Sequence, residues 1–156
     1  MIFVTVGTDN HDFSRLVEKM DYIASRERVI MQIGHSSFIP RNSKWFRFER
    51  NSVIEGLYKK ADVIVSHAGA GSIINSLKNG KIPIVVPRLK RLGEHVDDHQ
   101  LDLGRGLAKK GKVVLVEDVD YLGQAIKAKK MPYRRDKALV KNMEICLNEY
   151  EEISGR

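Results

Sequence analysis

Hydrophobic and polar residues alternate along this chain in two periods, one typical of buried strands and the other typical of amphipathic helices. Short apolar runs bounded by glycine, proline or polar residues predict β-strands, and apolar residues three and four apart predict helices between them. The predicted strands cover residues 2–6, 29–34, 45–48, 63–65, 82–86 and 113–116. The predicted helices cover residues 13–20, 53–58, 73–77, 98–109, 119–128 and 136–150.

This alternation of strands and helices predicts the fold class. Repeated strand–helix units form a parallel sheet with helices on both faces, so we expect a Rossmann-like α/β fold. Single residues predict two helix boundaries: Ser52 is expected to cap the second helix, and Gly111 to end the helix that begins at Asp98. No linker or repeat divides the sequence, and we expect one domain over residues 1–156, with a C-terminal helix from about Asp136.

Two turns place backbone N–H groups where a strand ends and a helix begins. Gly69, Ala70 and Gly71 follow one apolar run, and Gly7 and Thr8 follow the first strand. At such turns, free N–H groups meet the positive end of a helix dipole, and a glycine has no Cβ to keep a ligand away. The pattern suits a phosphate or a diphosphate.

The loop after the strand at residues 82–86 carries a second polar cluster. Its polar members are Arg88, Lys90, Arg91, Glu94, His95, Asp97, Asp98, His99 and Gln100. Ligands bind outside the carboxyl ends of parallel strands, so this loop and the glycine turns are expected on one rim of the sheet. A metal site on His95 and His99 is an alternative, but it lacks a third spaced ligand. The mixture of donors and acceptors favours a loop that hydrogen-bonds a sugar.

Composition and charge narrow the class of protein. Hydrophobic residues make up 42% of the 156 and charged residues 30%, which is typical of a soluble globular chain. No apolar run approaches the roughly 18–20 residues of a membrane span, and no basic segment precedes the apolar run at the start, so we expect a cytosolic protein. The single cysteine, Cys146, forms no internal disulfide. A net charge of +7 fits nucleic acid, an anionic membrane face or an anionic substrate, without choosing among them.

Three familiar motifs are absent on inspection. Residues 106–113, GLAKKGKV, approach the P-loop consensus, but they end in Val113 and precede a strand. A dinucleotide-binding fingerprint that starts at Gly69 would need its third glycine at Ile74. Nothing matches the G-x-S-x-G elbow of hydrolases. The P-loop, dinucleotide-binding and α/β-hydrolase classes are therefore disfavoured.

Four stretches together resemble a known family. They are MIFVTVGT at the start, SHAGAGS from Ser66, NGKIPIVVPR from Asn79 and LGEHVDDHQ from Leu92. Over roughly residues 1–125 the chain resembles glycosyltransferase family 28 C-terminal domains, and in particular small stand-alone catalytic subunits of the PssE/EpsF type. It is also similar to the catalytic subunit of the dolichol-linked N-acetylglucosaminyl transferase and to the C-terminal half of MurG. The resemblance implies the donor-binding half of a GT-B glycosyltransferase.

The resemblance also implies a donor site, carried over position by position. Its residues are Gly7, Thr8, His67, Gly69, Ala70, Gly71, Ser72, Asn75, Arg88, Glu94, His95, Asp98, His99 and Gln100. Residues 69–72 would face the diphosphate, aided by Arg88, and His99 and Gln100 would contact the sugar hydroxyls. The family's ribose-binding carboxylate falls at Asn75, which can still hydrogen-bond a hydroxyl, but without a charge.

The implied reaction is transfer of a sugar from a UDP-sugar, with inversion, to a lipid-linked acceptor in exopolysaccharide synthesis. The resemblance implies no metal or other cofactor, because GT-B enzymes commonly work without a bound metal, and fixed dipoles would then stabilise the departing UDP. The acceptor hydroxyl needs a general base, and the candidates are Asp9, His11, His95 or a residue of a partner chain. Asp9 stands where small members of the family usually have histidine.

The same resemblance implies a separate membrane-attached subunit that binds the acceptor, and hence a peripheral location on the cytoplasmic face of the membrane. Basic residues suited to an anionic leaflet are Arg88, Lys90, Arg91, Arg134 and Arg135. The isolated chain could instead pair with itself, and the C-terminal helix could pack on its own sheet or on a partner.

Two other classes of function stay open at this point. One is a nucleotide-binding regulatory subunit without catalysis, which the residues at Asn75 and Asp9 favour. The other is a basic nucleic-acid-binding domain, whose aromatic candidates are Trp45, Phe46 and Phe48. That aromatic cluster is better interpreted as a strand with its core residues.

Overall fold

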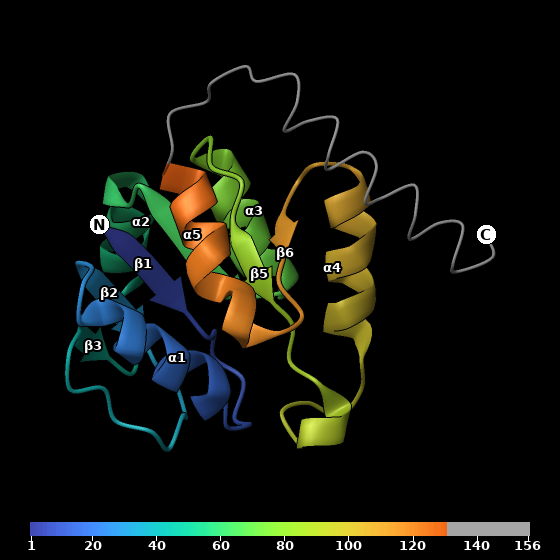
Figure 1. Ribbon diagram of the computed structural model, residues 1–156, viewed down its shortest axis with the longest axis horizontal. Helices are drawn as coiled ribbons and strands as arrows, with labels where there is room; N and C mark the ends of the chain where they lie inside the picture. The colour runs from blue at the N-terminus through green and yellow to red at the C-terminus, as the bar shows by residue number, and fades with distance from the viewer. Residues whose placement is uncertain (131–156) are drawn as a thin grey trace.

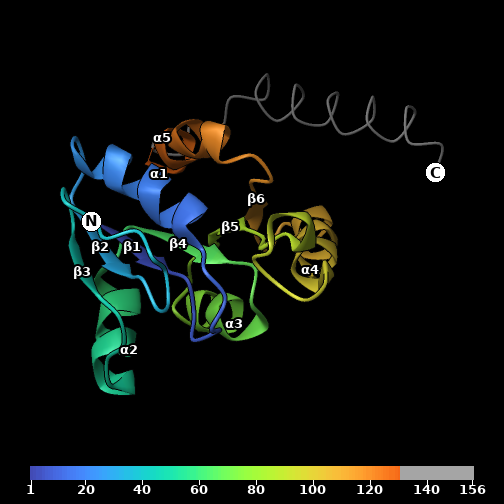
Figure 2. The same ribbon diagram turned by 90° about the horizontal axis from the view of Figure 1, so that it is seen from below.

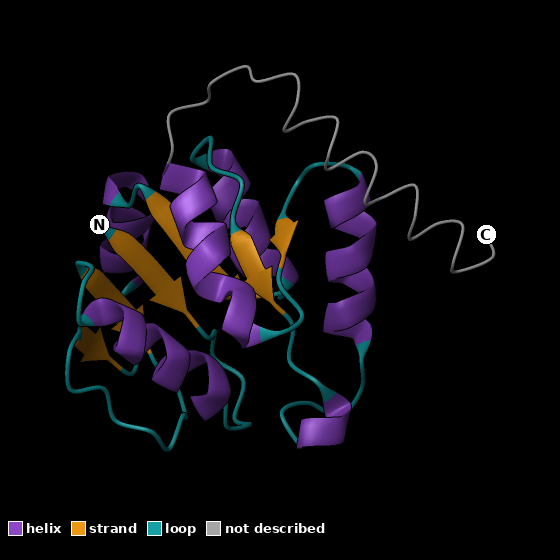
Figure 3. Cartoon of the chain, viewed as in Figure 1, coloured by secondary structure: helices purple, strands orange, loops and turns teal. Residues whose placement is uncertain are grey.

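The computed structural model describes residues 1–130, which form one six-stranded sheet flanked by helices (Figures 1 and 3). The strands are β1 (Ile2–Thr5), β2 (Val29–Gln32), β3 (Lys44–Phe46), β4 (Val63–His67), β5 (Ile84–Val86) and β6 (Val114–Leu115). Every neighbouring pair is parallel, and the strand order is β3-β2-β1-β4-β5-β6. This is the Rossmann order, and it confirms the predicted fold class.

Helices cover both faces of the sheet, as Figure 2 shows from below. They are α1 (Ser14–Ala24), α2 (Asn51–Lys60), α3 (Ala70–Lys78), α4 (His99–Lys109) and α5 (Leu122–Lys130), with the short 3-10 turns η1 (Lys90–Leu92) and η2 (Val119–Tyr121). Alternate strand residues point to opposite faces, so Ile2 and Val4 pack under α1 and α5, whereas Phe3 packs against α2. A third cluster joins α3 and α4 to Val85.

Three sequence predictions need correction. The second helix is capped by Arg50, whose extended backbone carbonyl accepts the N–H groups of Val53 and Ile54, so Ser52 lies inside the first turn. The helix predicted at residues 119–128 divides into η2 and α5, because the Asp118 carboxylate accepts the Asp120 N–H and tightens the first turn. The strand predicted from residue 82 begins at Ile84, after a proline that has no N–H to donate.

The aromatic strand is also less buried than predicted. β3 is an edge strand of three residues, and of its aromatic side chains only Phe46 packs on the core. Trp45 is 39% exposed, and Phe48, just beyond the strand, is exposed as well. Gly111 ends α4 as predicted, with a positive φ of 64°. The predicted C-terminal helix, Arg134, Arg135 and Cys146 lie outside the described residues.

The strand order has its switch point between β1 and β4, the position at which folds of this topology bind ligands. From β1 the chain winds outward to β3, then returns across the sheet through α2 to β4 and winds outward on the other side. At such a switch point the turns after the two central strands diverge and leave a crevice at their carboxyl ends. Both glycine turns lie there, on the edge toward which β1 points in Figure 1. No helix within residues 1–130 is both long and apolar enough to cross a membrane.

Candidate functional site

The imidazole of His67 lies between the two glycine turns at the end of β4. A Cβ added to Gly7 would lie 2.6 Å from its Cε1, and one added to Gly69 would lie closer still to its Nε2. Any other residue at either position would therefore collide with the ring. The space beside Gly69, which we expected a ligand to use, is occupied by the His67 ring. At Gly71, no atom of the described residues lies near the position of an added Cβ.

His67 is held as a neutral ring. Burial, aided by repulsion from the Arg88 guanidinium, lowers the pKa of His67 to about 4. Its Nδ1 lies 3.4 Å from the Thr5 carbonyl oxygen and donates to it. The opposite nitrogen, Nε2, lies beside the two glycine turns. A neutral imidazole there adds no charge to the crevice.

This pKa predicts a dependence of stability on pH. Because the ordinary pKa is 6.5, the unfolded chain binds a proton at His67 between pH 6.5 and 4 that the folded chain does not bind. The stabilisation is complete above pH 6.5 and is lost as the pH falls toward 4, by about 2 kcal/mol at pH 5. Urea unfolding of wild type and His67→Asn at pH 7 and pH 5 measures it. The variant should lose about that much less stability on acidification, and equal losses would contradict the prediction.

The N-terminus of α3 opens onto the same crevice. Gly69 is its N-cap, and no side chain of the described residues caps the helix. The N–H groups of Ala70, Gly71 and Ser72 thus have no acceptor in this part of the chain, while that of Ile73 bonds to the Gly69 carbonyl. Free N–H groups at the positive end of a helix form an anion-binding site. Ser72 is half-buried at this end of the helix and stays a predicted contact of the diphosphate.

The three predicted catalytic side chains come together where the loops after β1 and β5 meet. The Asp9 carboxylate accepts the His11 backbone N–H at 2.8 Å and lies 2.6 Å from its Nδ1. His95 approaches from the loop after β5, with its Nε2 4.0 Å from Asp9 Oδ2 and its ring 5.9 Å from that of His11. Partial burial would raise the pKa of Asp9, but the His11 hydrogen bonds and the Arg88 charge hold it below its usual range. Asp9 is therefore ionised at neutral pH.

Arg88 lies beneath this cluster and is fully buried. Its guanidinium donates to the carbonyl oxygens of Val6 at 3.0 Å, His11 at 2.9 Å, Asp12 at 3.3 Å and Glu94 at 3.2 Å. It also lies 4.6 Å from the centre of the Phe13 ring. The predicted contact of Arg88 with the diphosphate is therefore not the geometry seen. Its donors join the loop after β1 to the loop after β5.

Glu94 has a similar structural role, since its carboxylate is buried and faces the protein. Arg15 forms a two-pronged ion pair with it, both contacts being 2.8 Å, and the Leu89 N–H donates to it at 3.0 Å. A direct contact of Glu94 with a sugar, as predicted, does not fit this arrangement, because its oxygens already accept those donors.

The other predicted site residues lie on the rim with varied exposure. Thr8, Ala70, Gly71, Asn75, Asp98 and His99 are exposed. Gln100 accepts the Arg88 backbone N–H at 3.2 Å through its amide oxygen, and Asp98 accepts the Lys90 N–H at 3.0 Å. Within residues 1–130, no three His, Cys, Asp or Glu side chains are arranged to hold a metal ion.

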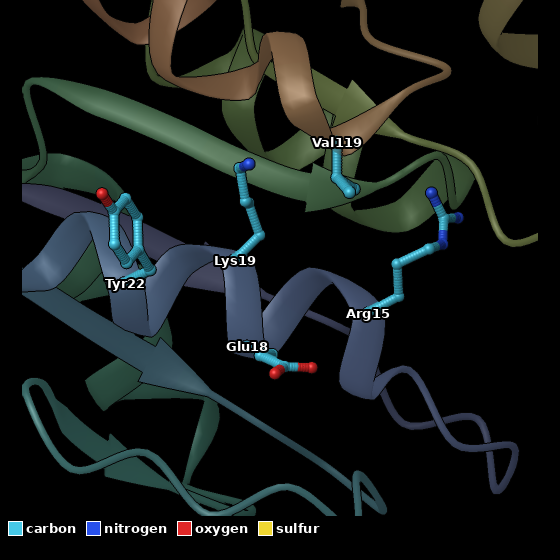
Figure 4. A pocket seen from close by; sticks show the side chains of 5 residues that line it. All are labelled: Arg15, Glu18, Lys19, Tyr22 and Val119. Atoms are coloured by element: carbon cyan, nitrogen blue, oxygen red, sulfur yellow. The ribbon is translucent and has the colours of Figure 1, made fainter.

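A separate hollow lies along α1 and is bordered by Val119 of η2 (Figure 4). Its lining comprises Arg15, Glu18, Lys19, Tyr22 and Val119. The Arg15 guanidinium is engaged with Glu94, and Lys19 pairs with Asp120 at 2.7 Å. The crevice between β1 and β4, with its free N–H groups and its ionisable side chains, is thus the candidate functional site.

Comparison with known protein families gives this geometry a context. The family model described as the glycosyltransferase family 28 C-terminal domain matches residues 1–147. The chain belongs to this family. The match extends across both glycine turns and the loop after β5, so the crevice of this family 28 domain lies wholly within the matched region.

Relatives and solved structures agree with the assignment. The family 28 domain is 35% identical over 122 residues to the human UDP-N-acetylglucosamine transferase subunit ALG13, covering 70% of this chain and 10% of that protein. It is 30% identical over 87 residues to a UDP-N-acetylglucosamine–N-acetylmuramyl-(pentapeptide) pyrophosphoryl-undecaprenol N-acetylglucosamine transferase of Syntrophus aciditrophicus, covering 56% and 23%. The crystal structure of the glycotransferase of kitacinnamycin matches with a TM-score of 0.64 at 18% identity, over 84% of this chain and 35% of that one.

The chain thus spans a small part of the length of these relatives, and the solved structure supports the fold alone. For the family 28 domain, sequence reasoning placed the glycine turns and the loop after β5 on one rim, because this follows from a parallel sheet. It offered Asp9, His11 and His95 as alternative bases, and the structure adds that the three side chains meet. It assigned no role in the site to Asp97, which bonds to His95, or to Arg15, which holds Glu94. The spacing of Asp97 two residues after His95 was the available signal, since short-range Asx contacts are common in such loops.

Proposed function

We propose that this chain is the donor-binding and catalytic subunit of a two-chain glycosyltransferase, which moves a sugar from a UDP-sugar to a lipid-linked acceptor in polysaccharide synthesis. The observation that carries the proposal is the uncapped N-terminus of α3, open to the crevice between β1 and β4. The free N–H groups of Ala70, Gly71 and Ser72 suit a diphosphate. Asp9, His11 and His95 meet in the loops after β1 and β5 and carry the groups that proton transfer requires.

The chemistry follows from what this crevice holds. Transfer breaks the bond between the anomeric carbon and the diphosphate, so negative charge grows on the departing UDP. Fixed N–H dipoles at the start of α3 stabilise that charge without having to reorganise. The neutral His67 beside them adds neither attraction nor repulsion. Asn75, exposed on the second turn of α3, is the proposed contact for the ribose, and His99 and Gln100 are the proposed contacts for the sugar.

The names of the relatives support the finer parts of this proposal. ALG13 is called a subunit of a UDP-N-acetylglucosamine transferase, which favours a UDP-sugar donor and a partner chain. The Syntrophus aciditrophicus protein is named for a pyrophosphoryl-undecaprenol substrate, which favours a lipid-linked acceptor. Lys90 and Arg91 are exposed beside the crevice and suit an anionic membrane face, whereas the buried Arg88 does not. We propose that the partner holds the chain at that face.

A charge placed at the start of α3 tests the donor site. Gly71→Asp puts a carboxylate beside the free N–H groups, in open space, and should weaken UDP binding tenfold or more by repulsion of the diphosphate. Gly123→Asp is the matched control, because Gly123 is likewise the second residue of a helix, in open space, on the opposite face of the sheet. It should leave UDP affinity unchanged. Calorimetric titration with UDP, GDP and a short oligonucleotide measures both effects.

The outcomes separate the competing functions. Uridine-selective binding that Gly71→Asp weakens and Gly123→Asp does not supports the donor site. Binding of UDP without any transfer in the presence of the membrane partner would point to a regulatory subunit. Tighter, salt-sensitive binding of the oligonucleotide would overturn the proposal in favour of nucleic acid.

A further inference from the structure

The loop after β5 fixes the backbone on which His95 stands. Its turn closes through Gly93, which has a φ of 69°, and through the Glu94 N–H, which donates to the Leu89 carbonyl at 3.2 Å. Glu94 itself is held through its carboxylate by Arg15 and through its carbonyl by Arg88. The residue that follows it therefore begins from an anchored position and not from a free loop.

Asp97 then sets the orientation of the His95 ring. His95 Nδ1 lies 3.0 Å from Asp97 Oδ1. The same carboxylate accepts the His99 backbone N–H at 3.1 Å and lies 2.8 Å from His99 Nδ1. These contacts, the backbone hydrogen bond foremost, hold the pKa of Asp97 below its usual range, so it is ionised at neutral pH. The Asp97 N–H donates to His95 Nδ1 at 3.4 Å, but the shorter bond from His95 Nδ1 to the charged Asp97 oxygen is the stronger.

An ionised carboxylate at Nδ1 determines where the proton of a neutral imidazole resides. Nδ1 must carry it, in order to donate to Asp97, which leaves the lone pair on Nε2. Nε2 faces Asp9 Oδ2 across 4.0 Å, too far for a direct hydrogen bond. The side chains remain accessible, with 20% of His95 and 33% of Asp9 exposed. Within residues 1–130, this basic nitrogen borders the crevice without a hydrogen-bond partner.

We infer that His95 is the general base of the transfer reaction, and that Asp97 is the positioning residue that keeps its Nε2 free of a proton. This assignment rests on the proposed function. The acceptor hydroxyl gives its proton to Nε2 while its oxygen forms the bond to the anomeric carbon. The bond from that carbon to the diphosphate oxygen breaks, and its electron pair leaves with UDP. The imidazolium then returns the proton to water.

His11 is the rival for this role, and the surroundings of the two rings distinguish them. The imidazolium that forms at His95 lies between two carboxylates, Asp97 at Nδ1 and Asp9 near Nε2. Among the carboxylates of residues 1–130, His11 pairs with Asp9 alone, whose Oδ1 is already bonded to its Nδ1, and its side chain is 38% exposed. The positive charge created by proton transfer is therefore better stabilised at His95.

The test uses two readouts on the full chain. Nitrogen NMR of ¹⁵N-histidine protein, with the His95 signals assigned from their loss in His95→Gln, should show protonation at Nδ1 in wild type and at Nε2 in Asp97→Ala. The second readout is release of UDP from UDP-N-acetylglucosamine, UDP-galactose or UDP-glucuronic acid, with water in place of the acceptor. His95→Gln and Asp97→Ala should each slow it about 100-fold or more, with UDP affinity changed less than twofold.

Asp102→Ala is the matched control, since Asp102 is an exposed carboxylate in the first turn of α4. It should alter neither the tautomer nor the rate. Two results would overturn the assignment of His95 and Asp97 while leaving the proposed function intact. One is protonation of His95 at Nε2 in wild type, and the other is a rate of UDP release that is lost in His11→Gln but kept in His95→Gln. Wild-type protein that neither binds UDP selectively nor releases it from any of the three donors would overturn the proposed function, and this assignment with it.

Discussion

Replacement of Arg88 by methionine is expected to lower the free energy of unfolding by about 3–5 kcal/mol, the range found when one partner of a buried charged network is removed. Methionine fills a similar volume but donates no hydrogen bond. The carbonyls of Val6 and Glu94, both buried around the guanidinium, would then lose a donor, as would those of His11 and Asp12. The stacking of the guanidinium on Phe13 would be lost as well. Urea unfolding followed by circular dichroism measures the change.

Arg91→Met is the control, because Arg91 is an exposed arginine in the same loop. Its effect should stay within about 0.5 kcal/mol. Arg88→Lys should fall between the two, since an ammonium keeps the charge but cannot reach four carbonyls with a planar fork. A cost for Arg88→Met below about 1 kcal/mol would mean that the two loops hold together without it.

The second large effect is expected at Gly69, where alanine should cost about 3 kcal/mol, at the upper end of overpacking by a single methyl. The φ of Gly69 is −79°, which alanine adopts freely, so the cost comes from contact and not from the backbone. The added Cβ would overlap His67 Nε2, and the ring cannot retreat because Gly7 lies against it on another side.

A double-mutant cycle isolates this contact. In a His67→Ala background the collision partner is gone, so Gly69→Ala should cost less than about 0.5 kcal/mol there. Gly71→Ala is the control for the change of residue type, since no atom of residues 1–130 outside the helix lies within 4 Å of its added Cβ. Thermal or urea unfolding of these variants suffices. Equal costs of Gly69→Ala in the two backgrounds would show that His67 is not the reason for the glycine.

The sequence predicts the sheet and the rim well, for a physical reason. Buried parallel strands are continuous apolar runs, and the turns that follow them must meet at one edge, so Asp9 and His95 could be expected to converge although 86 positions separate them. Arg88 shows the limit of that reasoning. An arginine after a strand looks like a free cation, and only the carbonyls of loops up to 82 residues away determine that it is buried.

The two glycines of the α3 turn show a second limit. Gly69 and Gly71 have the same pattern in the sequence, yet one makes room for a side chain of the protein and the other faces open space. The His67 side chain occupies the space beside Gly69 only in one rotamer, and that rotamer depends on packing between β1 and β4. Likewise, Ser52 has a good capping side chain but no role as a cap, because the extended backbone of Arg50 starts the helix two residues earlier.

The hydrogen bonds of the buried Arg88 affect the entropy of ligand binding. The turn after β1 and the loop after β5 give up their conformational freedom when the chain folds, since one guanidinium ties both and Arg15 ties the second again. Ordering a loop on binding costs about 1–2 kcal/mol per residue of backbone entropy, and here that cost belongs to folding. A ligand would therefore find a crevice that is already rigid, and mutations that loosen it would weaken binding through entropy without removing a single contact to the ligand.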